Sequence, residues 1–165
     1  MHFFRLAALA NFALLASVSA VFAHQPGVDL DEMMTDREAY FQVIDRPAPD
    51  SQLANADGAP VALSEFADKI VVLNFIYAGC LDGCPLHSEL IAEIQKLTNI
   101  SPMKDLVQFV TVTTDPERDT PDVLRTYGET HDLDPANWIF LTKLPNEDND
   151  ATRKVASEFG LEFTE

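Results

Sequence analysis

Two cysteines, Cys80 and Cys84, are the residues of this chain whose type and spacing point most directly to chemistry. They are the only cysteines among its 165 residues, and three residues separate them. The apolar run 70–77 precedes them and a stretch with helical periodicity follows, which places both sulfurs in a turn between a strand and a helix. Thiols in such a turn form a disulfide, exchange one with another protein, or hold a soft metal ion.

The three-residue spacer leaves several uses of the two sulfurs open. In helix-like backbone, residues four apart have Cα atoms about 6 Å apart, which a disulfide tolerates. A monovalent copper ion also accepts two thiolates and one further ligand, often an imidazole. Structural zinc is disfavoured because it prefers four ligands and the sequence has no second cysteine pair. An inert disulfide explains the placement poorly, since a very short loop gains little from cross-linking.

The histidines are the candidates for a third metal ligand. His87 lies one helical turn beyond Cys84, so its side chain can point toward the turn; the alternative is a histidine at the rim of the helix's apolar stripe. His131 falls at the end of a later predicted helix, where a cation complements the helix dipole. His24 follows the predicted leader described below, and its amine and imidazole together would chelate copper.

The start of the helix should also affect the acidity of the thiols. We expect unpaired backbone N–H groups and the positive end of the helix dipole to lower the pKa of Cys84. Asp82, between the two cysteines, opposes this effect.

The elements around the cysteine turn alternate between strands and helices. The nearly continuous apolar run 70–77 predicts a strand buried on both faces, at the centre of a helix-covered sheet. The following helix carries an apolar stripe at helical spacing, made of Leu86, Leu90, Ile91, Ile94 and Leu97. The other predicted elements are a hairpin over 52–55 and 60–63, strands over 107–114 and 138–142, and helices over 122–131 and 150–159. Thr120 should cap the first of these helices, and Gly160 should end the second.

This order predicts an α/β sandwich with parallel central strands. Composition alone does not separate a thioredoxin-like sheet from a small flavodoxin-like one. The two cysteines at a strand-to-helix corner favour the thioredoxin-like arrangement.

The chain begins with features of an export signal. A short basic start, Met1–Arg5, is followed by the almost wholly apolar run 6–23, which predicts a secretory signal cut after Ala23. The alternative is an uncleaved membrane anchor through residues 6–23, since the run is at the lower limit for spanning a bilayer. Either case places the rest in an oxidising, extracytoplasmic space. We therefore divide the chain into the leader (1–23), an acidic N-terminal extension (24–47) and a folded domain (48–165).

The charge balance restricts the partners. The net charge of −16 repels nucleic acid and anionic lipid. A positively charged partner or a metal cation suits this charge better, and the charge also keeps an exported protein soluble.

Three stretches resemble the Sco/SenC family of cytochrome c oxidase assembly proteins. The turn 74–85 (NFIYAGCLDGCP) looks like the family's copper-site turn, and 114–121 (TDPERDTP) is similar to its loop after the next strand. The segment 137–142 (NWIFLT) looks like the following strand. The resemblance covers residues from about 48 to 159.

The resemblance implies a thioredoxin-like fold in the periplasm and copper bound by Cys80 and Cys84. It further implies delivery of copper to, or reduction of thiols in, the oxidase subunit that carries a two-copper site. The family's third copper ligand is a histidine beyond the third helix, and no residue here matches it. The closing hairpin and last helix of the fold are also absent from the sequence, so we expect an exposed sheet edge, with poor solubility or dimerisation of residues 24–165.

Four functions remain as hypotheses at this point. The first is a copper metallochaperone, with Cys80 and Cys84 as copper thiolates and with Asp82 and the loop 115–119 at the rim. The second is a thiol–disulfide oxidoreductase, in which one of the two sulfurs attacks a protein disulfide. A thiol peroxidase is disfavoured, because Tyr77 and Leu81 stand where it would need threonine. The fourth is a degenerate family member that only binds a partner.

Overall fold

A mixed five-stranded sheet forms the centre of the protein. The computed structural model describes residues 43–80 and 83–163, and those from Pro47 onward belong to one compact unit. The strand order is β2-β1-β5-β4-β3. The strands are β1 (Gln52–Asn55), β2 (Pro60–Ala62), β3 (Ile70–Ile76), β4 (Val107–Thr113) and β5 (Trp138–Thr142). All five match strands that the sequence predicts, with ends that differ by at most one residue.

The strand directions follow from the connections. β3, β4 and β5 are parallel, and each connection between them contains a helix, as parallel neighbours require. β1 pairs antiparallel with both β2 and β5. The β1–β2 hairpin turns at Gly58, whose φ of +80° suits glycine, and the Asn55 side-chain oxygen accepts the N–H groups of Asp57 and Ala59. The predicted α/β sandwich with parallel central strands is confirmed.

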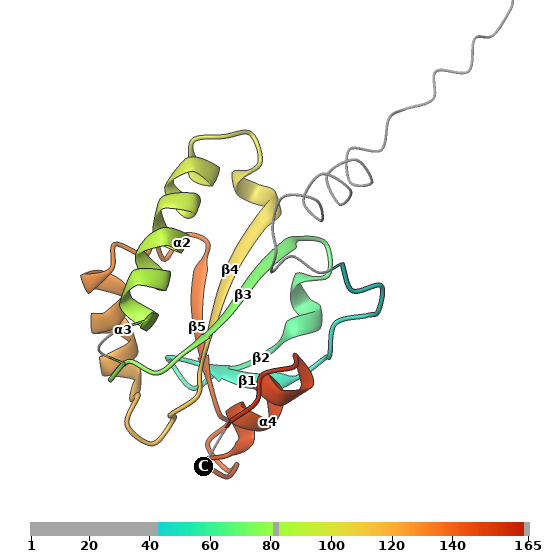
Figure 1. Cartoon of the computed structure of the whole chain (residues 1–165), viewed down its shortest axis with the longest axis vertical. Helices are drawn as coiled ribbons and strands as arrows, with labels where there is room; N and C mark the ends of the chain where they lie inside the picture. Colours follow the sequence, from blue (N-terminus) through green and yellow to red (C-terminus); the bar gives the residue numbers. More distant parts are fainter. Residues whose placement is uncertain (1–42, 81–82, 164–165) are drawn as a thin grey trace, which may run out of the picture. The chain divides into compact units, whose positions relative to one another are not determined.

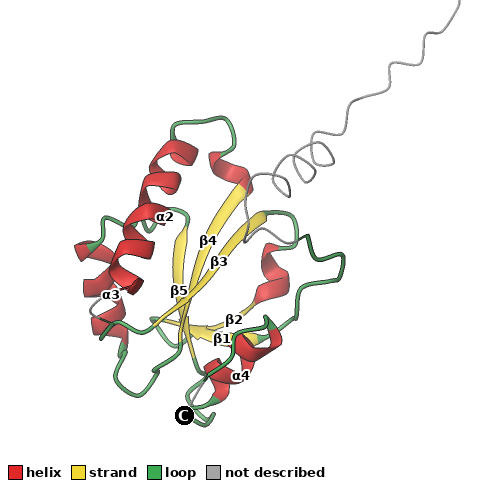
Figure 2. Ribbon diagram, viewed as in Figure 1, coloured by secondary structure: helices red, strands yellow, loops and turns green. Residues whose placement is uncertain are grey.

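Helices cover both faces of the sheet (Figure 1). Helices α2 (Gly83–Asn99) and α3 (Pro121–Thr130) lie on one face, and α4 (Ala151–Glu158) with the short helix η1 (Leu63–Phe66) lies on the other (Figure 2). Alternate side chains of β4 enter the two resulting cores. Phe109 stacks on Trp138 beneath α2 and α3, with ring centroids 5.3 Å apart, whereas Val110 and Val112 pack with Val155 of α4.

The predicted ends of α3 and α4 are confirmed. The Thr120 hydroxyl accepts the Val123 N–H at the start of α3. Gly160 follows α4 with a φ of +91°, in the left-handed region that favours glycine at a helix end.

The position predicted for β3 is wrong. It is not the central strand: among the described residues it pairs only with β4, and Ile70 and Val71 are 55% and 38% exposed. The strand buried on both faces is β4, in which only Gln108 is not fully buried. An apolar run indicates that both faces of a strand are covered, but it carries no information about neighbours along the sheet, so it could not tell an edge from the centre.

The apolar stripe of α2 does not face the sheet. Of the apolar stripe only Ile91 is buried, whereas Leu86, Leu90, Ile94 and Leu97 are each more than half exposed. The buried residues of α2 are Ser88, Ile91, Ala92 and Gln95. The physical reason is that the polar side chains on the sheet side of α2 form hydrogen bonds there and can therefore be buried. The spacing of the apolar residues alone points to the side of the helix that faces solvent.

Gln95 shows how a polar residue fixes this orientation of α2. It is fully buried, and its amide donates to the Asp134 carbonyl at 2.8 Å and to Asn137 Oδ1 at 2.7 Å. Its own oxygen accepts the Asp134 N–H at 2.8 Å. These bonds tie α2 to the loop that leads into β5.

Replacing Gln95 should therefore destabilise the fold. We expect Gln95→Leu to lower the free energy of unfolding by about 1–3 kcal/mol, because it removes the side-chain partner of the Asp134 N–H and carbonyl and one of the two donors to Asn137 Oδ1. Urea unfolding followed by circular dichroism measures the change. The exposed neighbour variant Glu93→Leu is the control, and equal losses in both variants would contradict this role of Gln95.

Candidate metal centre

The two cysteine sulfurs lie at the junction of β3 and α2. The Cys80 N–H donates to the Tyr77 carbonyl at 3.0 Å, which closes a tight turn after β3. The Cys84 N–H in the first turn of α2 points at Cys80 Sγ, 3.3 Å away.

Both cysteines are half-buried, and no disulfide joins them. A backbone N–H at a helix start that faces a sulfur favours the thiolate, the form that binds a soft metal. Leu81 and Asp82 lie outside the described residues.

The buried carboxylate of Asp119 holds the start of the cysteine turn through hydrogen bonds. Asp119 is 2% exposed, and its Oδ2 accepts the Ala78 N–H at 3.0 Å and the Thr113 hydroxyl. Ala78 follows β3 and Thr113 ends β4, so this one carboxylate joins the ends of two neighbouring strands. It fixes the backbone two residues before Cys80.

The loop that carries Asp119 is itself held in place. The Asp119 N–H bonds the Asp115 carbonyl at 2.9 Å, and Arg118 forms an ion pair with Asp115 at 3.3 Å. From the opposite face of the sheet, Arg153 Nε donates to the Thr114 carbonyl at 3.0 Å. The loop 115–119 thus packs at the end of the sheet where the cysteine turn lies.

The expected pKa of Cys84 is wrong in direction. Burial, the largest cause, raises the pKa of this thiol above its ordinary value; the hydrogen bond with Cys80 and the charges of Cys80 and Asp119 raise it further. A backbone hydrogen bond from the turn at Tyr77 lowers it, but does not reverse the shift. The helix N-terminus was expected to dominate, yet loss of water around the sulfur outweighs it. Burial therefore favours the protonated form of the Cys84 thiol.

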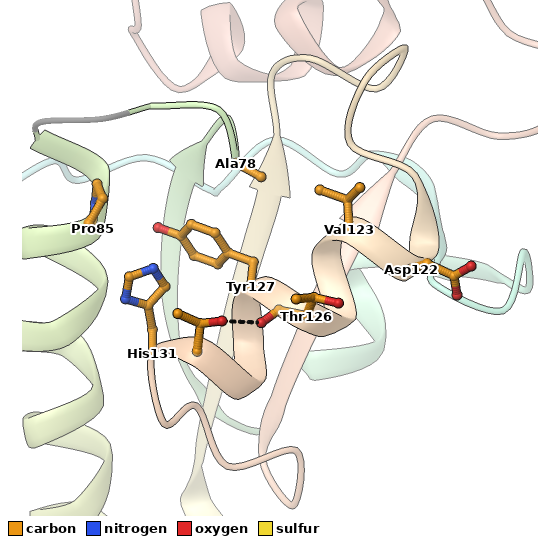
Figure 3. Close-up of a pocket in the computed structure, with 8 residues that line it drawn as sticks. Ala78, Pro85, Asp122, Val123, Thr126, Tyr127 and His131 are labelled. Carbon is orange, nitrogen blue, oxygen red and sulfur yellow. Dashed lines mark hydrogen bonds between the residues drawn. The ribbon is translucent and has the colours of Figure 1, made fainter.

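A groove runs from the cysteine turn along the space between α2 and α3 (Figure 3). It has a volume of about 450 Å³, and its lining includes Ala78, Pro85, Val123, Tyr127 and His131. Ala78 and Pro85 flank the cysteine turn on its two sides. The apolar walls of the groove make this side of the site a place where part of another molecule can pack.

Tyr127 connects the groove to the core. Its hydroxyl shares a hydrogen bond of 2.9 Å with Ser88. Burial, as the main cause, raises the pKa of Tyr127, and the cysteines and Asp119 contribute to the same direction. Sequence reasoning missed Tyr127 and Ser88; the one available signal was that Ser88 lies four residues after Cys84, on the same side of the helix.

The predicted histidines are not gathered around the sulfurs. His87 is exposed on α2, and His131 packs on the Tyr127 ring with centroids 4.3 Å apart. Its Nδ1 lies 3.8 Å from Glu89 Oε1. Within residues 43–80 and 83–163, no group of three or more His, Cys, Asp or Glu side chains is placed to hold a metal ion. His24 and the leader lie outside the described residues.

The family of this protein is clear from comparison with known sequences. The sequence profile of the SCO1/SenC family matches residues 45–164, which is most of the chain, and the protein belongs to this family. The SCO1 protein homolog of Bacillus subtilis is 28% identical over 88 residues, which are 53% of this chain and 45% of that protein. The chain thus spans about half the length of this curated relative.

Solved structures confirm the thioredoxin-like fold of the Sco proteins. A SCO1/SenC family lipoprotein from Bacillus anthracis is 26% identical, with a TM-score of 0.61 over 70% of this chain and 66% of that one. Bradyrhizobium japonicum ScoI, solved with copper bound, is 25% identical, with a TM-score of 0.58 over 69% of this chain and 67% of that one. No helix in the described part of the chain is long and apolar enough to cross a membrane.

Because the pKa of Cys84 is raised, we expect its thiol to react slowly at neutral pH. Alkylation of Cys84 by iodoacetamide should increase with pH and reach half its maximal rate at a higher pH than for an ordinary cysteine, since only the thiolate reacts. Rates are measured on the reduced protein by mass spectrometry of the Cys84 peptide. A midpoint below the ordinary cysteine value of about 8.5 would contradict the burial argument.

Asp119→Asn should change both stability and thiol acidity. Removing the buried charge weakens its bonds to Ala78 and Thr113, and we expect a loss of about 1–3 kcal/mol in the free energy of unfolding. The alkylation midpoint of Cys84 should fall, because the charge of Asp119 is one cause of the raised pKa. Asp122→Asn, whose carboxylate is 90% exposed, is the control. A midpoint unchanged in the folded Asp119→Asn variant would show that this charge does not act on the thiol.

Proposed function

We propose that this protein is a copper-binding metallochaperone of the Sco/SenC type that assists assembly of the copper centre of cytochrome c oxidase. The observation that carries the proposal is the thiol pair: two sulfurs at a helix start, not joined by a disulfide, with the Cys84 N–H directed at Cys80 Sγ. It stands in a member of a family with a copper-bound relative. Another solved relative, BsSco, is described as a member of the Sco family of cytochrome c oxidase assembly proteins.

The donor set suits copper as a cargo. Two thiolates are soft ligands and select monovalent copper over hard cations. Cys80 and Cys84 hold the ion, and Asp119 fixes the turn that presents them. His87 is the candidate third ligand on the same helix; it is exposed, so a rotation of its side chain costs little packing.

The acidity of the site favours transport over thiol exchange. A thiol with a raised pKa attacks disulfides slowly at neutral pH, because its thiolate is scarce. Metal binding still proceeds, since a copper ion displaces the thiol protons and binding becomes stronger as pH rises. The reduced thiol pair keeps a thiol–disulfide oxidoreductase acting on protein cysteines as the second candidate function.

The cellular setting follows from the leader and the charge. Residues 1–23 direct the chain out of the cytoplasm, to the periplasm, either as a cleaved signal or as a tether to the inner membrane. The partner is the copper-site subunit of the oxidase or another periplasmic copper or thiol protein. A net charge of −16 favours a positively charged docking surface on that partner.

Copper titration tests this function. The reduced protein is titrated with monovalent copper against a chromophoric competitor, beside Cys80→Ser, Cys84→Ser and His87→Ala. We expect one tightly held copper, lost in both cysteine variants. His87→Ala should weaken binding by about 10-fold to 100-fold if the imidazole is a ligand. Ser157→Ala, on the opposite face of the sheet, is the control.

Two results would contradict the proposal. Wild type that fails to compete for copper while its circular dichroism shows an intact fold removes copper delivery by this chain. Equal copper affinity in wild type and in the folded Cys84→Ser variant places the copper elsewhere. Rapid reduction of a protein disulfide by the copper-free thiols would then support the oxidoreductase.

A further inference from the structure

Tyr127 projects from α3 toward Pro85 at the start of α2 (Figure 3). Its hydroxyl shares the 2.9 Å hydrogen bond with Ser88, and both residues are buried, with exposures of 7% and 1%. Ser88 follows Cys84 by one helical turn, about 6 Å along the helix axis. Of the side-chain hydrogen bonds that join α2 to α3 or to the loop after it in the described residues, this one is the nearest to Cys84.

The ring of Tyr127 is packed on two sides, so its hydroxyl has a fixed position. The His131 ring lies against it with centroids 4.3 Å apart, and Phe140 of β5 meets it edge to face at 6.3 Å. Cys84 packs against the same core cluster that contains Tyr127. A buried hydroxyl that loses its partner costs free energy. Ser88 is therefore held close to Tyr127, and the turn of α2 that carries Cys84 is held with it.

Tyr127 and Asp119 belong to one continuous segment of the chain. The Asp119 carboxylate binds the Ala78 N–H, two residues before Cys80, and α3 begins directly after the loop that carries it. Because the helix between them is regular, the distance between these two anchors is fixed. One segment thus contacts both sides of the cysteine turn: the backbone before Cys80 and the helix after Cys84.

We propose that Tyr127 is a positioning residue of the copper site, which holds Cys84 in place relative to Cys80 through its hydrogen bond to Ser88. For copper this role rests on the proposed function, whereas the position of the two sulfurs does not depend on it. Two thiolates bind one ion most tightly when their separation is set before the ion arrives, because binding then loses less conformational entropy. The same separation governs how readily the two thiols form a disulfide with each other.

The thiol–disulfide equilibrium of the copper-free protein tests this role. The reduced protein is equilibrated with mixtures of oxidised and reduced glutathione, and mass spectrometry after acid quenching counts the remaining thiols. A disulfide between Cys80 and Cys84 releases two protons and two electrons, which convert one oxidised glutathione into two reduced ones. We expect Tyr127→Phe and Ser88→Ala each to lower the equilibrium constant for this disulfide about threefold to tenfold, the range that the net value of one hydrogen bond allows.

Copper affinity of the same variants gives a second measurement. Titration against the chromophoric competitor should show a Kd about threefold to tenfold higher in each variant. The double variant Ser88→Ala/Tyr127→Phe should bind no more weakly than the single ones, because all three remove the same bond. Gln95→Leu is the matched control. It removes a buried hydrogen-bond partner about three turns beyond Cys84 on α2, so it should lower resistance to urea without changing the disulfide equilibrium.

Three outcomes overturn this role of Tyr127. One is a wild-type protein that forms no disulfide between its two cysteines, since sulfurs held side by side can form one. Another is a disulfide equilibrium in folded Tyr127→Phe and Ser88→Ala equal to that of wild type; a loss of resistance to urea alone would make the bond purely structural. The third is an equal shift in Gln95→Leu.

Two further results separate the role of Tyr127 from other effects. If Tyr127→Phe does not fold, Ser88→Ala decides, because it removes the same bond from the other side. If wild type binds no copper while the variants still shift the disulfide equilibrium, the proposed copper function fails and the role of Tyr127 stands.

Discussion

The contact on which the site depends is the buried carboxylate of Asp119. It accepts the Ala78 N–H just after β3 and the Thr113 hydroxyl at the end of β4. A charge with 2% exposure is stable there only because both donors are present. The same two bonds determine where the backbone leaves the sheet and therefore where Cys80 begins its turn. The position of the sulfurs is thus set by a polar contact between strands, outside the cysteine motif itself.

The same arrangement bears on the proposed copper site. The helix start directs an N–H at Cys80 Sγ, which favours a thiolate, whereas burial and the nearby Asp119 charge favour the protonated thiol of Cys84. The second influence is larger in the metal-free protein. A soft cation changes this balance, because its charge replaces the missing water as the stabilising partner of the thiolates. This balance supports the proposed copper-binding function over the alternative of thiol exchange.

The orientation of α2 has a second consequence. Ser88 and Gln95 occupy the sheet side of the helix and are satisfied by Tyr127, Asp134 and Asn137. Their partners leave the leucine-rich stripe on the solvent side of the helix. Polar contacts within the fold therefore decide which side of α2 is buried. The cysteine turn and the exposed surface share one helix, but they lie on different parts of it.

The sequence by itself determined the strands and helices, and it predicted the chemistry of the cysteine turn. Strand and helix limits depend on local periodicity and caps, so 138–142, Thr120 and Gly160 could be assigned from neighbours in the chain. The cysteine pair and the three motifs indicated a Sco-type copper site without any coordinates. Only the tertiary structure decided which strand is central, which side of α2 is buried and how acidic Cys84 is. Each of these depends on groups that lie far apart in sequence, such as Gln95 with Asp134 or Cys84 with Asp119, and on the water that their packing excludes.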